Sequence, residues 1–326
     1  MPRYTIGVDF GSLSGRAVLV DTADGREIAH AQYDYPHGIV DCCLPNGRKL
    51  PDGWALQHPQ DYLDVLAHTL PALAAHVKPE EIAGIGLDCT ASTVLPVDEQ
   101  GVPLCFEERY CGCPHAYIMM WKHHGAQHQA HRMTALACSR REPWLDHYGG
   151  IVNAEWYFPK LLEVLEEAPQ VYQAMSHYVE AVDWLVWQLT GCLTRSYGCL
   201  GYKAFYQNEA FPDRGYFAGL HPAFENVVED KGSGRIVQPG ECAGMLTEEA
   251  AACYGLRPGI PVAAGNIDAH ACVPAAGIDG IGKLLAIIGT SACHIVMGEK
   301  TLPVPGMSGV VQGGVLPGLA AYGCCL

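Results

Sequence analysis

The stretch that decides the fold reads Tyr4-Thr5-Ile6-Gly7-Val8-Asp9-Phe10-Gly11-Ser12-Leu13-Ser14-Gly15-Arg16-Ala17-Val18-Leu19-Val20. Its two outer parts, residues 5–8 and 17–20, have the aliphatic and β-branched character of paired strands. The glycines and serines between them favour a tight turn. The sequence therefore predicts a β-hairpin over residues 4–20, with the carboxylate of Asp9 beside the turn.

Such a hairpin suits a nucleotide phosphate. Backbone amides and the Ser12 hydroxyl can bind phosphate oxygens, and Asp9 can attract Mg²⁺ through water. The alternative is a hairpin whose Asp and Gly only form the turn, because these residues are common in turns. A similar pattern in residues 284–297 favours the functional interpretation: an apolar strand, a turn with Gly289 and Thr290, and another apolar strand. Two such hairpins are what a duplicated fold closing on one nucleotide requires.

The charge balance limits the classes of partner. The 326-residue chain holds 20 Lys and Arg against 35 Asp and Glu, which gives a formal net charge of −15. This surplus of acid excludes nucleic acid and an anionic membrane as expected partners. It does not exclude a nucleotide substrate, since Mg²⁺ and local amides can bind the phosphates.

The pattern of cysteines and the lack of a signal-peptide pattern predict the cellular compartment of the protein. No basic stretch followed by an apolar segment opens the sequence, and no apolar run reaches the length of a membrane span. The fifteen cysteines are scattered, odd in number and without a Cys-x-x-Cys pair, which is typical of reduced thiols. We therefore expect a cytoplasmic protein.

The pattern along the chain predicts an α/β fold. A further turn at residues 21–25 extends the hairpin into a β-meander over residues 4–35. Pro59 marks the start of a helix with apolar residues at helical spacing. Residues 208–240 are rich in turn residues and predict no regular element. The other predicted elements are strands at 82–87, 93–97 and 260–264, and helices at 155–167, 183–188 and from 269 to near Gly277.

Residues 114–136 predict a helix with an unusual number of histidines. A zinc site is one interpretation, but no pair has the spacing of a zinc finger or a zincin. We favour a polar helix surface. The residues concerned are His115, His123, His124, His128 and His131, preceded by Cys111 and Cys113.

Residues 277–283 nearly match a P-loop. They follow a predicted helix instead of a strand, and Leu284 stands where Ser or Thr would hold Mg²⁺. We therefore reject a P-loop.

Asp268 is the candidate general base. It lies at a predicted strand-to-helix turn, where a side chain points into a crevice, and a well-placed base contributes roughly 10²–10⁴-fold to a rate. The alternative is structural: Asn266 or Asp268 could cap the helix that follows. The residues alone leave both open.

Several motifs together resemble the FGGY carbohydrate kinases, a family within the actin-like ATPase superfamily. Asp9-Phe10-Gly11-Ser12-x-Ser14-x-Arg16 and Gly289-Thr290-Ser291 resemble the two phosphate loops of that family. Gly265-Asn266-Ile267-Asp268 resembles its catalytic Gly-x-x-Asp motif. Five further stretches are similar to the ribulokinase branch: residues 86–93, 121–127, 148–156, 201–204 and 305–311.

This resemblance implies a fold and a reaction. The expected fold is an α/β actin-like (ribonuclease H-like) domain at residues 1–276, which binds sugar, and the incomplete start of a second, ATP-binding domain at residues 277–326. The implied reaction is Mg²⁺- and ATP-dependent phosphorylation of L-ribulose, or a related pentulose, at its 5-hydroxyl, a step of arabinose catabolism. Two alternatives are a non-catalytic sugar-binding remnant of such a kinase and an actin- or chaperone-like ATPase with a protein partner.

The resemblance also implies the roles of individual residues. Asp268 would bind and deprotonate the acceptor, and Asp9 would hold Mg²⁺ through water. By their side chains alone, Lys203 could be a solvated surface residue, Trp121 a core aromatic, and Glu155 an acid in the first turn of a helix. The implied phosphate-binding residues are Asp9, Gly11, Ser12, Arg16, Gly289 and Thr290, and the implied sugar-binding residues are Thr90, Ala91, Trp121, Glu155, Lys203 and Asp268.

The sequence departs from the family pattern at residues 318–326. Ribulokinases read Gly-Tyr-Glu-Ala-Gly-Gln there, and Gly323 aligns with the Glu expected to bind sugar. We therefore expect a truncated or frameshifted reading frame, or a fragment. The sequence is compatible with a homodimer.

Overall fold

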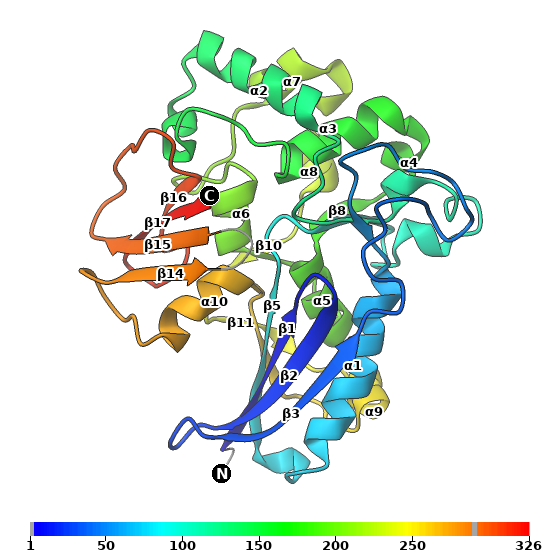
Figure 1. Ribbon diagram of the computed structural model, residues 1–326, viewed down its shortest axis with the longest axis vertical. Helices are drawn as coiled ribbons and strands as arrows, with labels where there is room; N and C mark the ends of the chain where they lie inside the picture. The colour runs from blue at the N-terminus through cyan, green and yellow to red at the C-terminus, as the bar shows by residue number, and fades with distance from the viewer. Residues whose placement is uncertain (1–2, 289–291, 326) are drawn as a thin grey trace.

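The computed structural model describes residues 3–288 and 292–325, and its largest element is a seven-stranded mixed sheet (Figure 1). The strands lie in the order β11-β12-β5-β1-β2-β3, and β13 also pairs with β5. The first three strands form an antiparallel meander, whereas β1, β12 and β13 run parallel to β5. The bounds are β1 Tyr4–Phe10, β2 Ser14–Asp21, β3 Glu27–Asp34, β5 Ile82–Cys89, β11 Cys242–Met245, β12 Pro261–Ala263 and β13 Asn266–Ile267.

Buried and less buried side chains alternate along β1, and this alternation shows which face of the sheet is buried. Ile6, Val8 and Phe10 are almost fully buried, and the Phe10 ring stacks on Tyr62 with centroids 5.3 Å apart. Successive side chains of a strand point to opposite faces, so Asp9 projects from the other face. Three helices cover the buried face, with α9 packed against both others: α1 Pro59–Ala74, α5 Ala181–Thr190 and α9 Glu248–Tyr254.

A second, aromatic-rich core lies beside the central sheet, in the helical part at the top of Figure 1. It joins a small sheet of order β4-β7-β6-β8 to the helices α2, α3, α4, α7 and α8, and Leu200 of the helix at residues 197–203 also belongs to it. A short parallel pair, β9 and β10, lies below it. The bounds are β4 Leu56–Gln57, β6 Val94–Val97, β7 Ile118–Met119, β8 His177–Glu180, β9 Thr194–Ser196, β10 Arg235–Val237, α2 Gln127–Arg140, α3 Tyr157–Glu167, α4 Pro169–Ala174, α7 Arg214–Leu220 and α8 Val227–Lys231.

The last part of the chain forms an antiparallel sheet of order β14-β15-β17-β16. The helices α6 (Tyr197–Lys203) and α10 (Asp268–Ala275) link it to the rest, since α6 packs on β16 and α10 on β15. The Tyr202 hydroxyl donates to the Ala321 carbonyl at 2.6 Å. The bounds are β14 Leu284–Ile288, β15 Ala292–Gly298, β16 Gly309–Gln312 and β17 Ala320–Cys325.

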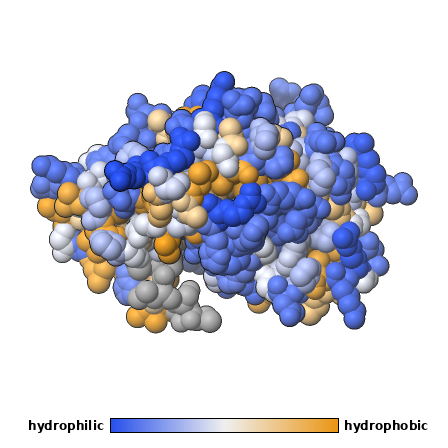
Figure 2. Space-filling view, turned by 90° about the horizontal axis from the view of Figure 1, so that it is seen from above, coloured by the Kyte–Doolittle hydropathy of each residue, from blue (hydrophilic) through white to orange (hydrophobic). Residues whose placement is uncertain are grey.

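The surface of the molecule is mixed in character. Figure 2 shows a mostly hydrophilic face with apolar patches between the polar side chains. Exposed large apolar residues are frequent in and around β14 and β15, where Ile281, Leu284, Ile288, Val296 and Leu302 are each at least 40% exposed. Among the described residues, the helices are all too short or too polar to cross a bilayer.

Several predicted elements are confirmed. The hairpin and the meander form as β1, β2 and β3, and the helix predicted from Pro59 is α1. The second predicted hairpin appears as the antiparallel pair β14 and β15, while its turn at residues 289–291 lies outside the described residues. The α/β class follows from these elements together with the parallel strands β1, β5 and β12.

The helix predicted at residues 114–136 is wrong in its first half. Residues 114–116 form one 3₁₀ turn, residues 118–119 form β7, and the helix begins only at Gln127. Tertiary pairing overrides the local pattern here, because Met119 is the register partner of Leu56 in β4. The predicted histidines therefore do not share one helix face. A smaller error is the start of α3, which is Tyr157. The turn-rich residues 208–240, for which the sequence is uninformative, contain α7, α8 and β10.

The contact between β2 and α1 yields a stability prediction. A Cβ atom at Gly15 would overlap both Val65 methyl groups, one of them at 2.7 Å. Overpacking of this kind costs about 1–3 kcal/mol, so Gly15→Ala should lower the free energy of unfolding by that amount in urea titrations followed by circular dichroism. The control is Gly86→Ala in β5, where a Cβ meets no atom within 4 Å. Equal unfolding midpoints for both variants would contradict the packing argument.

Candidate functional site

Three carboxylates gather where the parallel strands of the central sheet end. Asp9 in β1 lies directly beside Asp88 in β5, because the two residues are register partners. Asn266 in β13 is the partner of Asp88 on the other side, and Asp268 begins α10 two residues later. Ligands of α/β sheets bind outside the carboxyl ends of parallel strands. This edge is therefore the candidate site.

Asp88 is electrostatically the most perturbed residue of the group. Burial raises its pKa to about 8. The carboxylate of Asp9 adds to the rise through its charge and through a hydrogen bond with Asp88, and the charge of Asp268 adds to it as well. Two carboxyl groups in one site cannot both ionise without cost. A divalent cation relieves such repulsion, and carboxylate oxygens suit Mg²⁺. The donor set thus fits the ion that the family resemblance implies.

Asp268 is half-buried at the first turn of α10. Burial raises its pKa to about 6, and the charge of Asp9 adds to the rise. The opposing influences are the Ala269 N–H, which donates to Asp268 Oδ1 at 2.6 Å, and the positive charge of Lys203. A carboxyl with this pKa is mostly ionised at neutral pH and can accept a proton.

Neither Asn266 nor Asp268 occupies the N-cap position of α10. That position is Ile267, which makes no side-chain capping bond. The Asn266 side chain accepts the neighbouring Ile267 N–H at 2.9 Å. Asp268 Oδ1 accepts the Ala269 N–H from within the first turn of the helix, and Asp268 Oδ2 has no bond to that turn among the hydrogen bonds of the described residues.

The turn between β1 and β2 is held by residues from distant segments. The Gly11 N–H donates to the Ser14 carbonyl at 3.0 Å, which closes the turn. The Trp121 indole N–H donates to Ser12 Oγ at 3.1 Å, and the Gln57 amide donates to the Ser12 carbonyl at 3.0 Å. Trp121 is only half-buried, so it is not a core aromatic. The predicted phosphate turn and the predicted sugar-site tryptophan are therefore in direct contact.

Two further predicted residues lie beside the carboxylates. The Thr90 N–H donates to the Phe10 carbonyl at 3.3 Å, which places the segment of Thr90 and Ala91 next to the end of β1. Lys203 ends α6, with its ammonium 5.9 Å from the centre of the Trp156 ring and its charge acting on Asp268. Lys203 thus faces the site and is not a freely solvated surface residue.

Two of the remaining predicted site residues bond to side chains other than the three carboxylates, and two lie outside the described residues. Glu155 precedes α3, so it is not in the first helical turn, and its Oε1 lies 2.9 Å from His124 Nε2. Arg16 is exposed and donates to the Gln32 side chain at 3.3 Å, away from the carboxylates. Gly289 and Thr290 lie outside the described residues.

Asp88 is the residue that sequence reasoning missed. It stands in an otherwise apolar strand, at the same position relative to the strand end as Asp9. An acid at the end of a buried strand was a usable signal, but only the β1–β5 register shows that the two side chains are neighbours.

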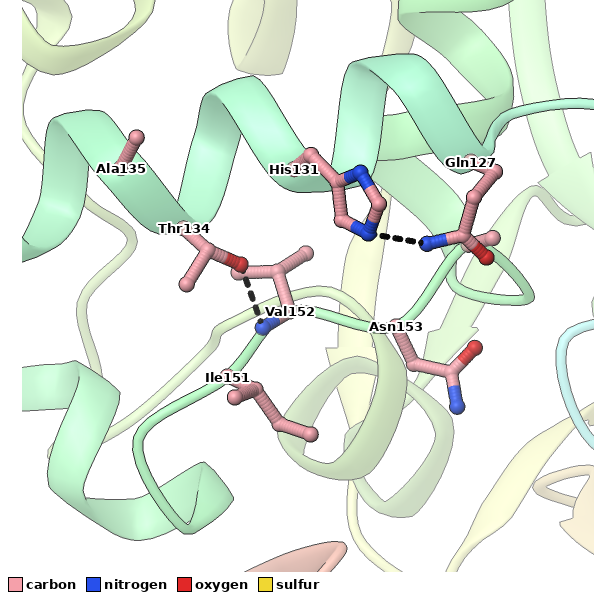
Figure 3. A pocket seen from close by; sticks show the side chains of 8 residues that line it. Gln127, His131, Thr134, Ala135, Ile151, Val152 and Asn153 are labelled. Atoms are coloured by element: carbon pink, nitrogen blue, oxygen red, sulfur yellow. Dashed lines mark hydrogen bonds between the residues drawn. The ribbon is translucent and has the colours of Figure 1, made fainter.

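A separate hollow of about 460 Å³ lies between α2 and the segment before α3 (Figure 3). Its polar lining includes Gln127, which donates to His131, and Thr134, which accepts the Val152 N–H at 2.9 Å. None of the three carboxylates lines it. We therefore assign the candidate site to the sheet edge and not to this hollow.

Comparison with known proteins identifies the family. Residues 4–273 match the N-terminal domain of the FGGY family of carbohydrate kinases. The chain belongs to this family. It is 50% identical over 314 residues to a ribulokinase of Bacillus licheniformis and 47% identical over 325 residues to one of Mycolicibacterium smegmatis. These matches cover 95% and 98% of the chain but only 57% and 58% of the two relatives.

Solved structures of a xylulose kinase and a glycerol kinase share the fold. A xylulose kinase from Rhodospirillum rubrum matches with a TM-score of 0.74 at 22% identity, over 99% of this chain and 60% of its own. A glycerol kinase from Plasmodium falciparum, solved with ADP, matches with a TM-score of 0.74 at 14% identity, over 99% and 61%. The predicted actin-like ATPase fold is confirmed.

The raised pKa of Asp88 predicts how stability depends on pH. The folded chain keeps this proton up to about pH 8, whereas the unfolded chain releases it near pH 4. The folded state therefore loses stability relative to the unfolded state as pH rises between these values. Asp88→Asn removes the penalty, so its melting temperature should exceed that of the wild type by a margin that widens from pH 5 to pH 8.5.

Asp52→Asn, at an exposed position before β4, is the matched control and should show a constant difference from the wild type over the same range. A constant difference for Asp88→Asn as well would contradict the raised pKa of Asp88 in the folded chain.

Proposed function

We propose that this chain carries the sugar site and the general base of an ATP-dependent kinase that phosphorylates the 5-hydroxyl of L-ribulose, in arabinose catabolism. The chain spans a little over half the length of the ribulokinases it matches. The observation that supports the proposal most is the arrangement of Asp9, Asp88 and Asp268 at one sheet edge, with Lys203 beside them.

Asp268 is the proposed general base. The 5-hydroxyl oxygen attacks the γ-phosphorus of ATP, the bond from that phosphorus to the bridging oxygen breaks, and ADP leaves. The hydroxyl proton passes to the Asp268 carboxylate, whose pKa of about 6 favours the ionised form at neutral pH. In phosphoryl transfer the protein contributes mainly positioning and charge stabilisation. A fixed carboxylate next to Lys203 supplies both.

Asp9 and Asp88 are the proposed residues for Mg²⁺, with Asp9 acting through water. When bound, the ion neutralises phosphate charge. Gly11 and Ser12 would bind phosphate oxygens from the β1–β2 turn, with Gly289 and Thr290 proposed for the second loop. The position of Arg16, bonded to Gln32, gives no support to its predicted contact with phosphate.

The proposed sugar site lies between the turn and α6. Lys203 can donate to sugar hydroxyls while its charge stabilises Asp268, and Trp121 is held at the turn by Ser12. Thr90 and Ala91 follow β5 at the same edge, and Glu155 is proposed to act from the segment before α3. A cation that faces the acidic site favours a hydroxylated ligand over the alternative of a protein-binding, chaperone-like ATPase.

We propose a domain boundary near residue 276. The family match ends at residue 273, and the residues after α10 form their own sheet, β14–β17. Residues 1–276 would thus bind the sugar and residues 277–326 would begin the part that binds ATP. A cytoplasmic location and compatibility with a homodimer stay predictions.

The direct test measures ADP formation by the purified 326-residue chain with Mg·ATP, with and without L-ribulose. We expect turnover that depends on ribulose, together with a ribulose-dependent rise in melting temperature. Thermal protection without turnover would support the alternative of a non-catalytic sugar-binding protein. If L-ribulose causes neither turnover nor a rise in melting temperature, the proposed substrate is contradicted.

Asp268→Asn tests the proposed base. The variant should lose roughly 10²–10⁴-fold in phosphoryl transfer, while L-ribulose still raises its melting temperature. Asp279→Asn is the control, because the Asp279 side chain is 90% exposed and pairs with Lys283; its turnover should match the wild type. Loss of both transfer and ribulose protection in Asp268→Asn would indicate a structural role for Asp268.

A further inference from the structure

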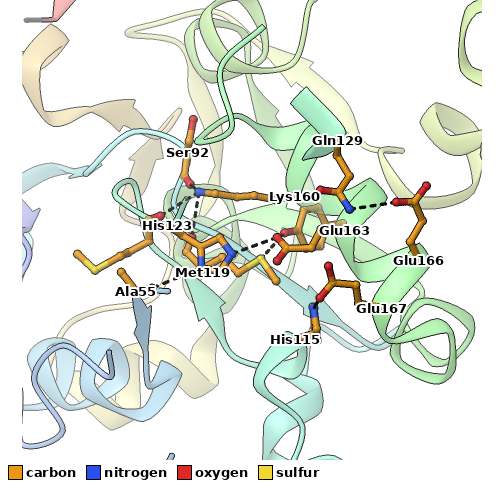
Figure 4. A network of polar contacts seen from close by, with 12 residues as sticks. Ala55, Ser92, His115, Met119, His123, Gln129, Lys160, Glu163, Glu166 and Glu167 are labelled. Atoms are coloured by element: carbon orange, nitrogen blue, oxygen red, sulfur yellow. Dashed lines mark hydrogen bonds and ion pairs between the residues drawn. The ribbon is translucent and has the colours of Figure 1, made fainter. Parts of the chain in front are cut away.

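A second group of ionisable side chains lies on and beside α3, in the helical part of the molecule (Figure 4). It consists of His115, Glu163 and Glu167, whose ligand atoms all lie within 4.8 Å of one another. His115 belongs to the 3₁₀ turn Pro114–Ala116, and the two glutamates are one helical turn apart on α3. Residues four apart on a helix point to the same side, so both carboxylates face the histidine.

One atom of this group is buried without a partner. Glu163 is fully buried, and its Oε1 has no hydrogen-bond partner among the described residues. His115 is 7% exposed, and its Nε2 makes only a long ion-pair contact, with Glu167 Oε2 at 3.6 Å. A buried polar atom without a partner is costly. An unpaired carboxylate oxygen beside a loosely paired imidazole nitrogen indicates a ligand between them.

The neighbours of Glu163 fix its side chain but do not satisfy it. The backbone N–H of Ala55 donates to His123 Nδ1 at 3.4 Å, so His123 Nε2 carries the proton and donates to Glu163 Oε2 at 3.0 Å. Lys160 is equally buried, but its ammonium donates to backbone carbonyls, among them that of Ser92 at 2.6 Å. Glu163 Oε1 is therefore the oxygen that is left for another partner.

We propose that His115, Glu163 and Glu167 bind one divalent transition-metal ion, with Zn²⁺ as the best match. One imidazole nitrogen and two carboxylate oxygens are common zinc ligands. Ligands at the usual zinc distances lie roughly 3.3 Å apart in a tetrahedron, close to the 3.6 Å between His115 and Glu167. The Glu167 side chain is 49% exposed, which leaves an entry path and room for a water molecule as fourth ligand.

The surroundings support a structural role for this ion. The Trp54 ring packs edge-on against both His115 and His123, with centroids 4.8 Å apart in each case. This apolar wall shields one side of the group. The ion would join the 3₁₀ turn to α3. None of the three carboxylates at the sheet edge belongs to this group, and the proposal does not rest on kinase activity.

The test is titration of the chelator-treated, dialysed full chain with ZnCl₂ in the absence of nucleotide, followed by calorimetry and by the visible spectrum of Co²⁺ as a substitute ion. We expect one equivalent to bind and to raise the melting temperature. Glu167→Gln and His115→Gln should each weaken Zn²⁺ binding more than about tenfold, since even residues that only support metal ligands typically cost 10–100-fold.

Matched controls separate this site from the many other thiols and histidines. His128→Gln on α2 and Glu225→Gln before α8 change exposed residues of the same types and should bind Zn²⁺ as the wild type does. Glu167 is partly exposed, so Glu167→Gln should fold, which far-ultraviolet circular dichroism checks. Equal Zn²⁺ affinity in Glu167→Gln and the wild type, or no binding by the wild type, would overturn the proposal in favour of a simple ion pair.

Discussion

The register between β1 and β5 is the constraint on which the candidate site depends. It sets Asp9 beside Asp88 at the ends of two parallel strands, and β13 brings Asp268 to the same edge. Burial, together with the like charges of Asp9 and Asp268, opposes ionisation and raises the pKa of Asp88 to about 8. A fold maintains such a group only if strand pairing and the apolar face beneath it hold the backbone in place. Here Phe10, stacked on Tyr62, supplies that support directly below Asp9.

Buried cations connect the central sheet to the helical part. Lys160 donates to the carbonyls of Ser92 and Met120 at 2.6 and 2.9 Å, and burial lowers its pKa to about 7. Ser92 adopts a left-handed backbone conformation, with φ of 53°, which is unfavourable for a residue with a side chain. The bond from Lys160 holds this conformation and so fixes the segment of Thr90 and Ala91 relative to α3. The buried Arg195 of β9 donates to the Tyr178 carbonyl of β8 at 2.7 Å and so connects these two small sheets.

Local patterns predicted the elements whose residues interact over short distances. The β1–β2 hairpin, the meander and α1 follow from alternation, turn residues and a proline at a helix start, all of which act within a few residues. The same approach failed at residues 114–136, where pairing of Met119 with Leu56 outweighs helical propensity. Sequence reasoning named Asp9, Asp268 and Lys203 from their motifs, and these residues lie at the candidate site. Asp88 was not found, because its role depends on a strand partner almost eighty residues away.

The sequence by itself determined the family, the α/β class and the residue types that the chemistry requires, because motifs and periodicity are properties of neighbouring residues. Only the tertiary structure decided which of those residues meet. It placed Lys203 against Asp268, joined Trp121 to Ser12, directed Arg16 away from the carboxylates, and brought His115 to Glu163 and Glu167. The physical reason is that these contacts join segments far apart in the chain. Their geometry follows from strand register and helix packing, which local sequence does not specify.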